Sequence, residues 1–108
     1  MKQYAIYIGL RDAESREQRF DTEKYRSVLK HVCRSYHIAF SVHTVDGGYF
    51  HDDGTYVDET TLVLTVLDAE PETVREIARD LCAFFRQESV MVTESEAEVF
   101  FIRERLGE

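Results

Sequence analysis

The residues best suited to chemistry lie in one polar stretch, residues 46–59, which combines histidine, carboxylates, glycines and aromatic rings. His51, Asp52 and Asp53 could form an acid-base group or hold a cation if this stretch folded back over the protein. An EF-hand calcium loop is excluded, because the ligands and the closing glutamate do not fall at the required spacing around Gly54. Since Asp and Gly also form ordinary turns, the pattern favours a hydrated hairpin tip over a catalytic group.

Two further candidates, Tyr7 and His43, lie in strand-like runs and could line a cleft on the surface of a sheet. The complete set of predicted binding residues is Tyr7, His43, Tyr49, His51, Asp52 and Asp53. No catalytic residue can be assigned, because the chain has no phosphate-binding glycine loop, no Gly-x-Ser-x-Gly elbow and no His-Glu-x-x-His motif. The sequence therefore favours a non-enzymatic protein and predicts no cofactor.

A metal site is considered because Cys33 and His37 are four residues apart in a predicted helix and could share a face, whereas His31 falls off that face. Cys33 instead matches Cys82 on the apolar stripe of a second predicted helix, which suits a small buried side chain. Structural zinc normally takes four ligands. We therefore predict no metal site, and two cysteines in this arrangement predict no disulfide scaffold.

Hydrophobic periodicity predicts the elements that position these residues. The runs 4–10 and 61–67 are almost continuously apolar, as is typical of central strands. A helix is predicted from about residue 22 to residue 36, with Asp21 as its N-cap. A second helix begins at Pro71, and its apolar positions have the same spacing as those of the first.

The order of these elements defines the predicted fold class, an α+β ferredoxin-like βαββαβ two-layer sandwich. Residues 1–108 form one domain, because a chain of 108 residues is too short for two ordinary ones. The first and third strands are expected to lie parallel at the centre of the sheet. Short apolar runs at 89–93 and 98–103 predict a fourth strand and an additional C-terminal strand.

Apolar side chains occupy both faces of the predicted central strands, with Ile6 and Ile8 on one face and Tyr7 on the other. Both helices of a two-layer sandwich cover the same face of the sheet. Apolar surface left in water costs about 25 cal/mol per Å². We therefore expect a homo-oligomer or a closed ligand cleft on the second face, unless the last strand or the long loop folds over it.

The composition narrows the possible partners. A net charge of -8 disfavours binding to nucleic acid and to anionic membrane surfaces. No apolar run is long enough to span a bilayer, and residues 1–10 contain no signal core, so the predicted location is the cytoplasm.

Several short segments resemble a family of small bacterial proteins known only as a domain of unknown function. They are the run from Gln87 to Val92, the run from Tyr7 to Leu10, the pair Gly48-Tyr49, and Gly54 with Glu59-Thr60. The resemblance implies a ferredoxin-like fold and a bacterial origin, with no established activity. In topology, a long hairpin between the second and third strands is also similar to that of the PII signalling proteins, whose loop contacts partners.

Two functional hypotheses follow. The first is a cytoplasmic, oligomeric interaction or regulatory module that contacts a partner protein through residues 46–59. The second is a small enzyme of the dimeric α/β-barrel type, in which Tyr7 and His43 line a cleft on the uncovered sheet face. A concave, solvent-filled surface at His43 would favour the enzyme.

Overall fold

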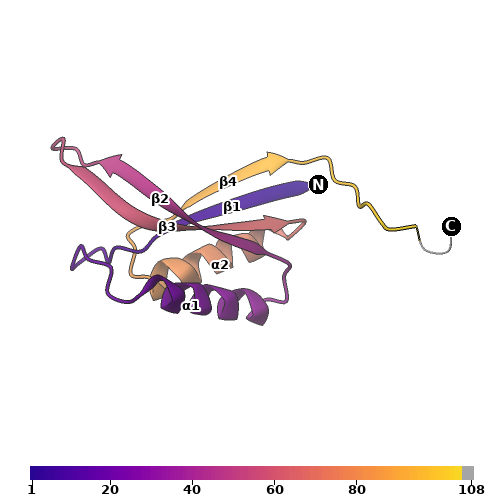
Figure 1. Cartoon of the computed structure of the whole chain (residues 1–108), viewed down its shortest axis with the longest axis horizontal. Coiled ribbons are helices and arrows are strands. Elements are labelled where there is room, and N and C mark those ends of the chain that lie inside the picture. The colour runs from indigo at the N-terminus through magenta and orange to yellow at the C-terminus, as the bar shows by residue number, and fades with distance from the viewer. Residues whose placement is uncertain (106–108) are drawn as a thin grey trace.

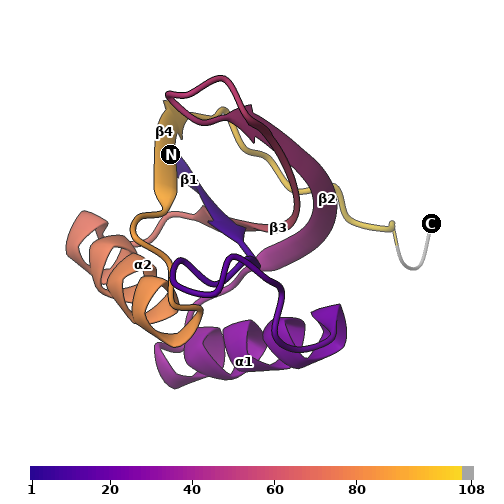
Figure 2. The same ribbon diagram turned by 90° about the vertical axis from the view of Figure 1, so that its left-hand side faces the viewer.

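A four-stranded antiparallel sheet with two helices on one face makes up the protein (Figures 1 and 2). The structure is a computed structural model and describes residues 1–105. The elements are β1 (Lys2–Gly9), α1 (Thr22–Ser35), β2 (Ser41–Phe50), β3 (Tyr56–Leu67), α2 (Pro71–Phe84) and β4 (Met91–Glu96). Their order and the sheet order β2-β3-β1-β4 confirm the predicted α+β ferredoxin-like fold.

The two central strands are β1 and β3, as predicted, but they pair antiparallel and not parallel. The helical crossover α1 returns the chain so that β2 runs in the direction of β1. The hairpin then reverses β3, which inserts between them. The prediction of a parallel central pair was therefore wrong, because it ignored the reversal made by the β2-β3 hairpin.

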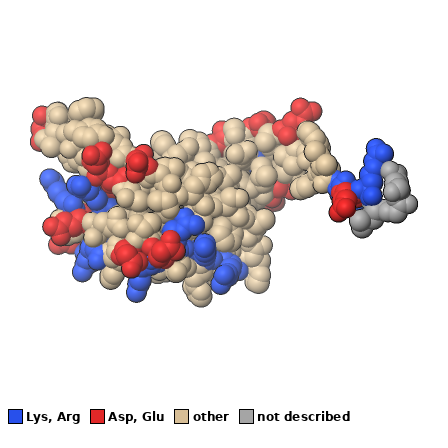
Figure 3. All heavy atoms as spheres, in the orientation of Figure 1, with Lys and Arg blue, Asp and Glu red and all other residues tan. Residues whose placement is uncertain are grey.

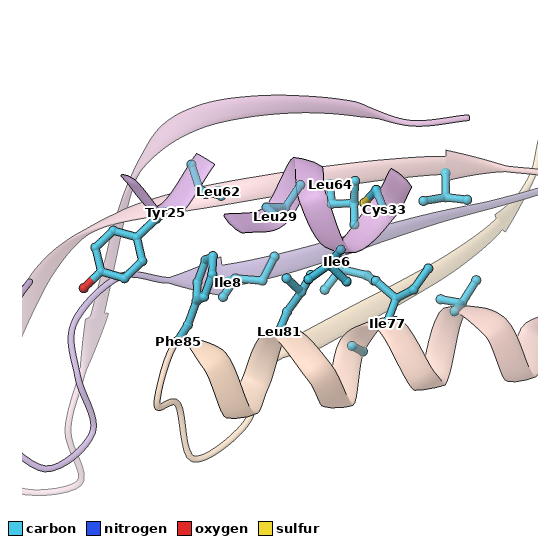
Figure 4. Packing of buried hydrophobic residues seen from close by; sticks show 14 of the residues in the cluster. Ile6, Ile8, Tyr25, Leu29, Cys33, Leu62, Leu64, Ile77, Leu81 and Phe85 are labelled. Carbon is cyan, nitrogen blue, oxygen red and sulfur yellow. The ribbon is translucent and has the colours of Figure 1, made fainter. Parts of the chain in front are cut away.

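The hydrophobic core lies between the sheet and the helices (Figure 4). Alternate strand residues such as Ile6, Ile8 and Leu64 are fully buried against Leu29 of α1 and Leu81 of α2. These positions follow from the period of two in a strand and of 3.6 in a helix.

The two cysteines occupy equivalent helix positions but differ in burial. Cys33 is fully buried, and burial raises the pKa of its thiol to about 11. Cys82 is only partly buried, and its thiol donates to the carbonyl oxygen of Gln87 at 3.1 Å. A protonated thiol in an apolar core packs as a small hydrophobic side chain.

Both helices begin at the capping residue or proline that the sequence predicts. Asp21 caps α1, its carboxylate accepting from the Lys24 backbone N–H at 2.9 Å, and the rings of Phe20 and Tyr25 pack 5.9 Å apart across the cap. Pro71 is the first residue of α2. Within residues 1–105, neither helix has the length and apolar character needed to cross a membrane.

The predicted additional C-terminal strand does not form. After Ala97, whose N–H donates to the carbonyl of Met1 at 2.8 Å, residues 98–105 have no regular structure. They leave the sheet in an extended path away from the hairpin (Figure 1). A strand needs a neighbour for its backbone hydrogen bonds, and residues 98–105 run on from β4 without turning back beside either edge strand, β2 or β4. The suggestion that this segment covers the second sheet face is therefore also wrong.

Candidate functional site

The sheet face opposite the helices, called here the open face, is overhung by the β2-β3 hairpin (Figure 2). The turn of this hairpin is closed by hydrogen bonds from His51 N–H to the Thr55 carbonyl and from Gly54 N–H to the His51 carbonyl, both 2.9 Å. Gly54 has φ of 87°, a conformation that glycine adopts without strain. Asp53 accepts from the Thr55 N–H at 2.9 Å, which lowers the pKa of its carboxyl group. The Asp-Gly turn of the hairpin predicted at 46–59 is therefore formed.

A hollow of about 950 Å³ lies on the open face beneath the hairpin, and we call it the open-face hollow. Its base is formed by the adjoining parts of β1, β2 and β3, and its walls by residues 11–16 and 87–89. Side chains that line it include Tyr7, Tyr49, Glu59, Thr61 and Met91. The second face is therefore concave next to the hairpin, whereas the cleft alternative expected a concave surface at His43, which does not line this hollow.

The structure places four of the six predicted binding residues around the hollow. They are Tyr7, Tyr49, His51 and Asp53. The rings of Tyr49 and His51 pack edge to face, with centroids 5.4 Å apart. Asp52 is exposed in the turn and does not line the hollow. His43 also lies outside the lining, although it belongs to the open face.

The position of His43 follows from the sheet register. It pairs with Val63 on β3, and Val63 pairs with Tyr7 on β1, so all three side chains lie in one row on the open face. His43 is on the edge strand β2, exposed to solvent. The hollow therefore extends from Tyr7 toward the hairpin and not toward His43.

Glu59 is the functional candidate that the sequence reasoning missed. It is partly buried in the base of the hollow, and its Oε2 accepts from the Arg11 backbone N–H at 3.1 Å. Its carboxylate lies over Gly9, where a β-carbon would come within 2.3 Å of Oε1. Only glycine leaves room for this carboxylate. A glycine inside an apolar strand is a recognised sign of such a close approach, and it was the available signal.

Asp12 fixes the loop that forms one wall of the hollow. This side chain is 3% exposed, and its Oδ1 accepts from the backbone N–H groups of Ser15 and Glu14 at 2.9 and 2.8 Å. Oδ2 is 2.9 Å from Nε of Arg86 and 3.8 Å from a guanidinium nitrogen of Arg19. The Ser15 hydrogen bond is the main cause of a lowered Asp12 pKa, and Arg86 and Arg19 act in the same direction.

The charge of the hollow is predominantly acidic. The residues that line it include the acidic Asp12, Asp46, Asp53, Glu59 and Glu88 and the basic Arg11 and Arg16, but the Asp12 carboxylate is buried and paired with Arg86 and Arg19. In residues 1–105, no group of three histidine, cysteine or acidic side chains is close enough to hold a metal ion. An acidic, partly aromatic hollow suits an organic cation better than an anion.

Comparison with known proteins agrees on the fold. No family model matches the chain, and no curated protein sequence does. Among solved structures, a phage SAM lyase in the apo state has a TM-score of 0.69 at 21% identity over 99% of this chain and 92% of its own. The phage SAM lyase in complex with S-methyl-5'-thioadenosine has a TM-score of 0.68 at 20% identity, over 88% and 80% of the two chains.

Two other solved structures cover most of both chains. A DUF3240 family protein from Shewanella baltica has a TM-score of 0.57 at 8% identity, over 95% of this chain and 97% of its own. The periplasmic divalent cation tolerance protein CutA from Archaeoglobus fulgidus has a TM-score of 0.58 at 14% identity, over 94% and 88%. These similarities define the class, a small α+β domain of ferredoxin-like fold, and at such identities they show the fold alone. The resemblances to a bacterial family of unknown function and to PII proteins stay predictions.

Proposed function

We propose that the protein is a small enzyme that binds an organic sulfonium compound in the open-face hollow and cleaves it as a lyase. The class of substrate is that of S-adenosylmethionine (SAM). The observation that carries the proposal is the carboxylate of Glu59, held over Gly9 in the base of an acidic hollow that also contains aromatic rings. The similarity in fold to a phage SAM lyase supports the choice of this reaction.

The size of the hollow suits a nucleoside-sized ligand. Ligand pockets usually have volumes of roughly 300–1,000 Å³, and the open-face hollow, at about 950 Å³, lies within that range. Tyr7 and Tyr49 offer flat surfaces for a purine ring or for the sulfonium charge.

Glu59 has the role of binding the positive charge. Its carboxylate is positioned by the Arg11 N–H before the ligand arrives, so binding requires little reordering of this side chain. Cleavage of the bond from sulfur to the amino-acid side chain returns the bonding electron pair to sulfur and leaves a neutral thioether, methylthioadenosine. The carboxylate oxygen of the amino-acid fragment forms a new bond to the carbon that sulfur releases, so the fragment leaves as a lactone and no water is added. Loss of the positive charge weakens the attraction to Glu59 and favours product release.

Incubation of the purified protein with SAM tests this proposal, with methylthioadenosine measured by chromatography. We expect the wild type to release methylthioadenosine faster than buffer does and Glu59→Gln to lower the rate at least tenfold. The matched control is Glu17→Gln, which removes an exposed carboxylate outside the open-face hollow and should keep the wild-type rate. A wild-type rate equal to that of buffer contradicts the enzymatic assignment.

An interaction module remains the second candidate function, because the hairpin exposes aromatic side chains. Phe50 is 70% and Tyr56 54% exposed. The sequence favours this function, and the hollow beside Tyr7 and Glu59 supports the enzyme, although it does not reach His43. Homo-oligomer formation supports either function, because a second copy could cover the exposed apolar side chains. The cytoplasmic location and a partner protein at residues 46–59 stay predictions.

Deletion of the turn His51 to Thr55 tests the interaction module. If the hairpin is the contact element, the shortened protein keeps its fold and its oligomeric state but loses any partner recovered by pull-down. A partner recovered at full strength by the shortened protein contradicts this second function.

A further inference from the structure

The protein exposes a second apolar surface at the end of the molecule opposite the hairpin. Phe100, Phe101 and Ile102 are 77%, 83% and 88% exposed. They belong to the extended residues 97–105, called here the tail, which project beyond the sheet (Figure 1). Three consecutive large apolar side chains at this exposure are typical of a surface that another protein surface covers.

The hairpin carries a matching apolar surface. Phe50 and Tyr56 pair across β2 and β3 with ring centroids 5.1 Å apart, and both are more than half exposed. Strand alternation puts them on the same side of the sheet as the helix-covered Leu62 and Leu64. The hairpin extends past the helices, so this aromatic pair has no helix beneath it (Figure 1).

These two surfaces cannot meet within one chain. The tail leaves the sheet beside Met1, to which Ala97 is hydrogen-bonded, whereas the base of the hairpin is bonded to the other end of β1 through Leu10 and Thr60. The molecule is 61 Å long, and its two ends point in opposite directions (Figure 1). We propose that the tail of one copy docks on the Phe50-Tyr56 pair of a second copy, head to tail.

The charges beside the two surfaces are complementary. Arg103 directly follows the apolar triplet of the tail. Asp58 shares the hairpin face of Phe50 and Tyr56, and Asp52 lies in the adjacent turn. Figure 3 shows acidic side chains at this end of the molecule. Glu98 and Glu104 also belong to the tail, but Arg103 is the charge next to the triplet and would meet an aromatic pair bordered by carboxylates, which favours a second copy of this chain over an anionic partner.

The contact is heterologous, because the tail of one copy meets the hairpin of the next, and an open assembly keeps one unused tail and one unused hairpin until a ring closes. This property distinguishes it from a two-fold dimer in which two tails meet. It also predicts that two defective variants restore one contact when they are mixed.

The test uses two variants of the full chain and analytical ultracentrifugation. The tail variant carries Phe100→Ser, Phe101→Ser and Ile102→Ser, and the hairpin variant carries Phe50→Ser and Tyr56→Ser. We expect the wild type to exceed the mass of one chain, 12.6 kDa, and each variant alone to have that mass. An equimolar mixture should form a complex of twice the mass of one chain, because the intact tail of one variant binds the intact hairpin of the other. Higher salt concentration should weaken this complex.

The matched control is Phe84→Ser, which removes a phenylalanine that is 63% exposed on α2, away from both surfaces, and should keep the wild-type mass. Three results would overturn the proposal. They are a monomeric wild type at high protein concentration, a wild-type mass in either variant, and a mixture that forms no complex. The last of these would indicate a tail-to-tail dimer or a different contact surface.

Discussion

The carboxylate of Glu59 occupies the space that a side chain at Gly9 would fill, since a β-carbon there would lie 2.3 Å from Oε1. The two residues are 50 positions apart in the chain, and the β1-β3 pairing brings them together. This contact connects a glycine in a buried strand to the acidic group of the open-face hollow. It also provides a direct way to displace the carboxylate without removing it.

Gly9→Ala should cost less than the roughly 1–3 kcal/mol that is usual for overpacking, because the conflicting atoms are the end of the flexible Glu59 side chain, which can move aside. In a Glu59→Ala background the same change should cost close to nothing, because the conflicting carboxylate is absent. Denaturant unfolding of the wild type, the two single variants and the double variant gives this coupling energy. Equal costs of Gly9→Ala in both backgrounds would show that Glu59 does not lie over Gly9.

The charge of Glu59 should determine which ligands bind. We expect the wild type to bind a sulfonium nucleoside more tightly than its neutral thioether analogue, and Glu59→Gln to reduce this preference about tenfold, or about 1.4 kcal/mol. Competition against a fluorescent adenosine derivative measures both affinities. If Glu59→Gln keeps the full preference, the cation is bound elsewhere.

The stability of the protein should depend on pH through Asp12. Its pKa is below the ordinary value of 3.8, so the folded state favours the ionised form. This contribution to stability is complete above pH 3.8 and is lost as the pH falls through the folded-state pKa. Thermal unfolding as a function of pH should therefore show a loss of stability below about pH 4 that is smaller in Asp12→Asn.

Asp12→Asn should also lower the melting temperature at neutral pH, because Arg86 and Arg19 lose their charged partner. Asp52→Asn is the matched control, since Asp52 is exposed in the hairpin turn, and it should leave the melting temperature unchanged. If the two variants behave alike, Asp12 does not anchor the loop.

Leu64 of β3 is fully buried in the hydrophobic core between the sheet and the helices. Leu64→Ala should lower the free energy of unfolding by about 2–5 kcal/mol, because it removes buried apolar volume and leaves a cavity. Val92→Ala on β4 is the comparison, since Val92 is 42% exposed and should cost much less. If chemical denaturation shows that Leu64→Ala and Val92→Ala lower the free energy of unfolding by similar amounts, Leu64 does not lie in the core.

The elements with strong local signals could be predicted from the sequence. The Asp21 cap, the Pro71 helix start and the Asp-Gly turn each depend on neighbours in the chain, and each is present in the structure. The relative direction of β1 and β3 depends on how a hairpin inserts between distant strands, and this was predicted wrongly.

The additional strand that was predicted in the C-terminal segment does not form, for a related reason. Residues 98–103 have the composition of a strand, but a strand forms only beside a partner, and this segment leads away from both edge strands, β2 and β4. Local propensity could not show the path of this segment.

The site could be predicted only in part. Tyr7 was predicted on the uncovered sheet face and Tyr49 in the hairpin, and the sheet register brings both to the hollow. His43 lies on the correct face but too far along the edge strand, and strand alternation alone could not show where the hollow ends. Glu59 was missed because its role depends on a glycine in a distant strand.

The most direct test of the central claim is an NMR titration of the isotope-labelled wild type with methylthioadenosine, the stable product of the proposed reaction. We predict that the largest changes in backbone amide shifts occur at Gly9, Gly47, Glu59 and Thr61, around the base of the open-face hollow. Amides of α1 and α2, on the opposite side of the sheet, should change little. Changes confined to the helices or to the hairpin turn, or the absence of any change at saturating ligand, would contradict the proposed site.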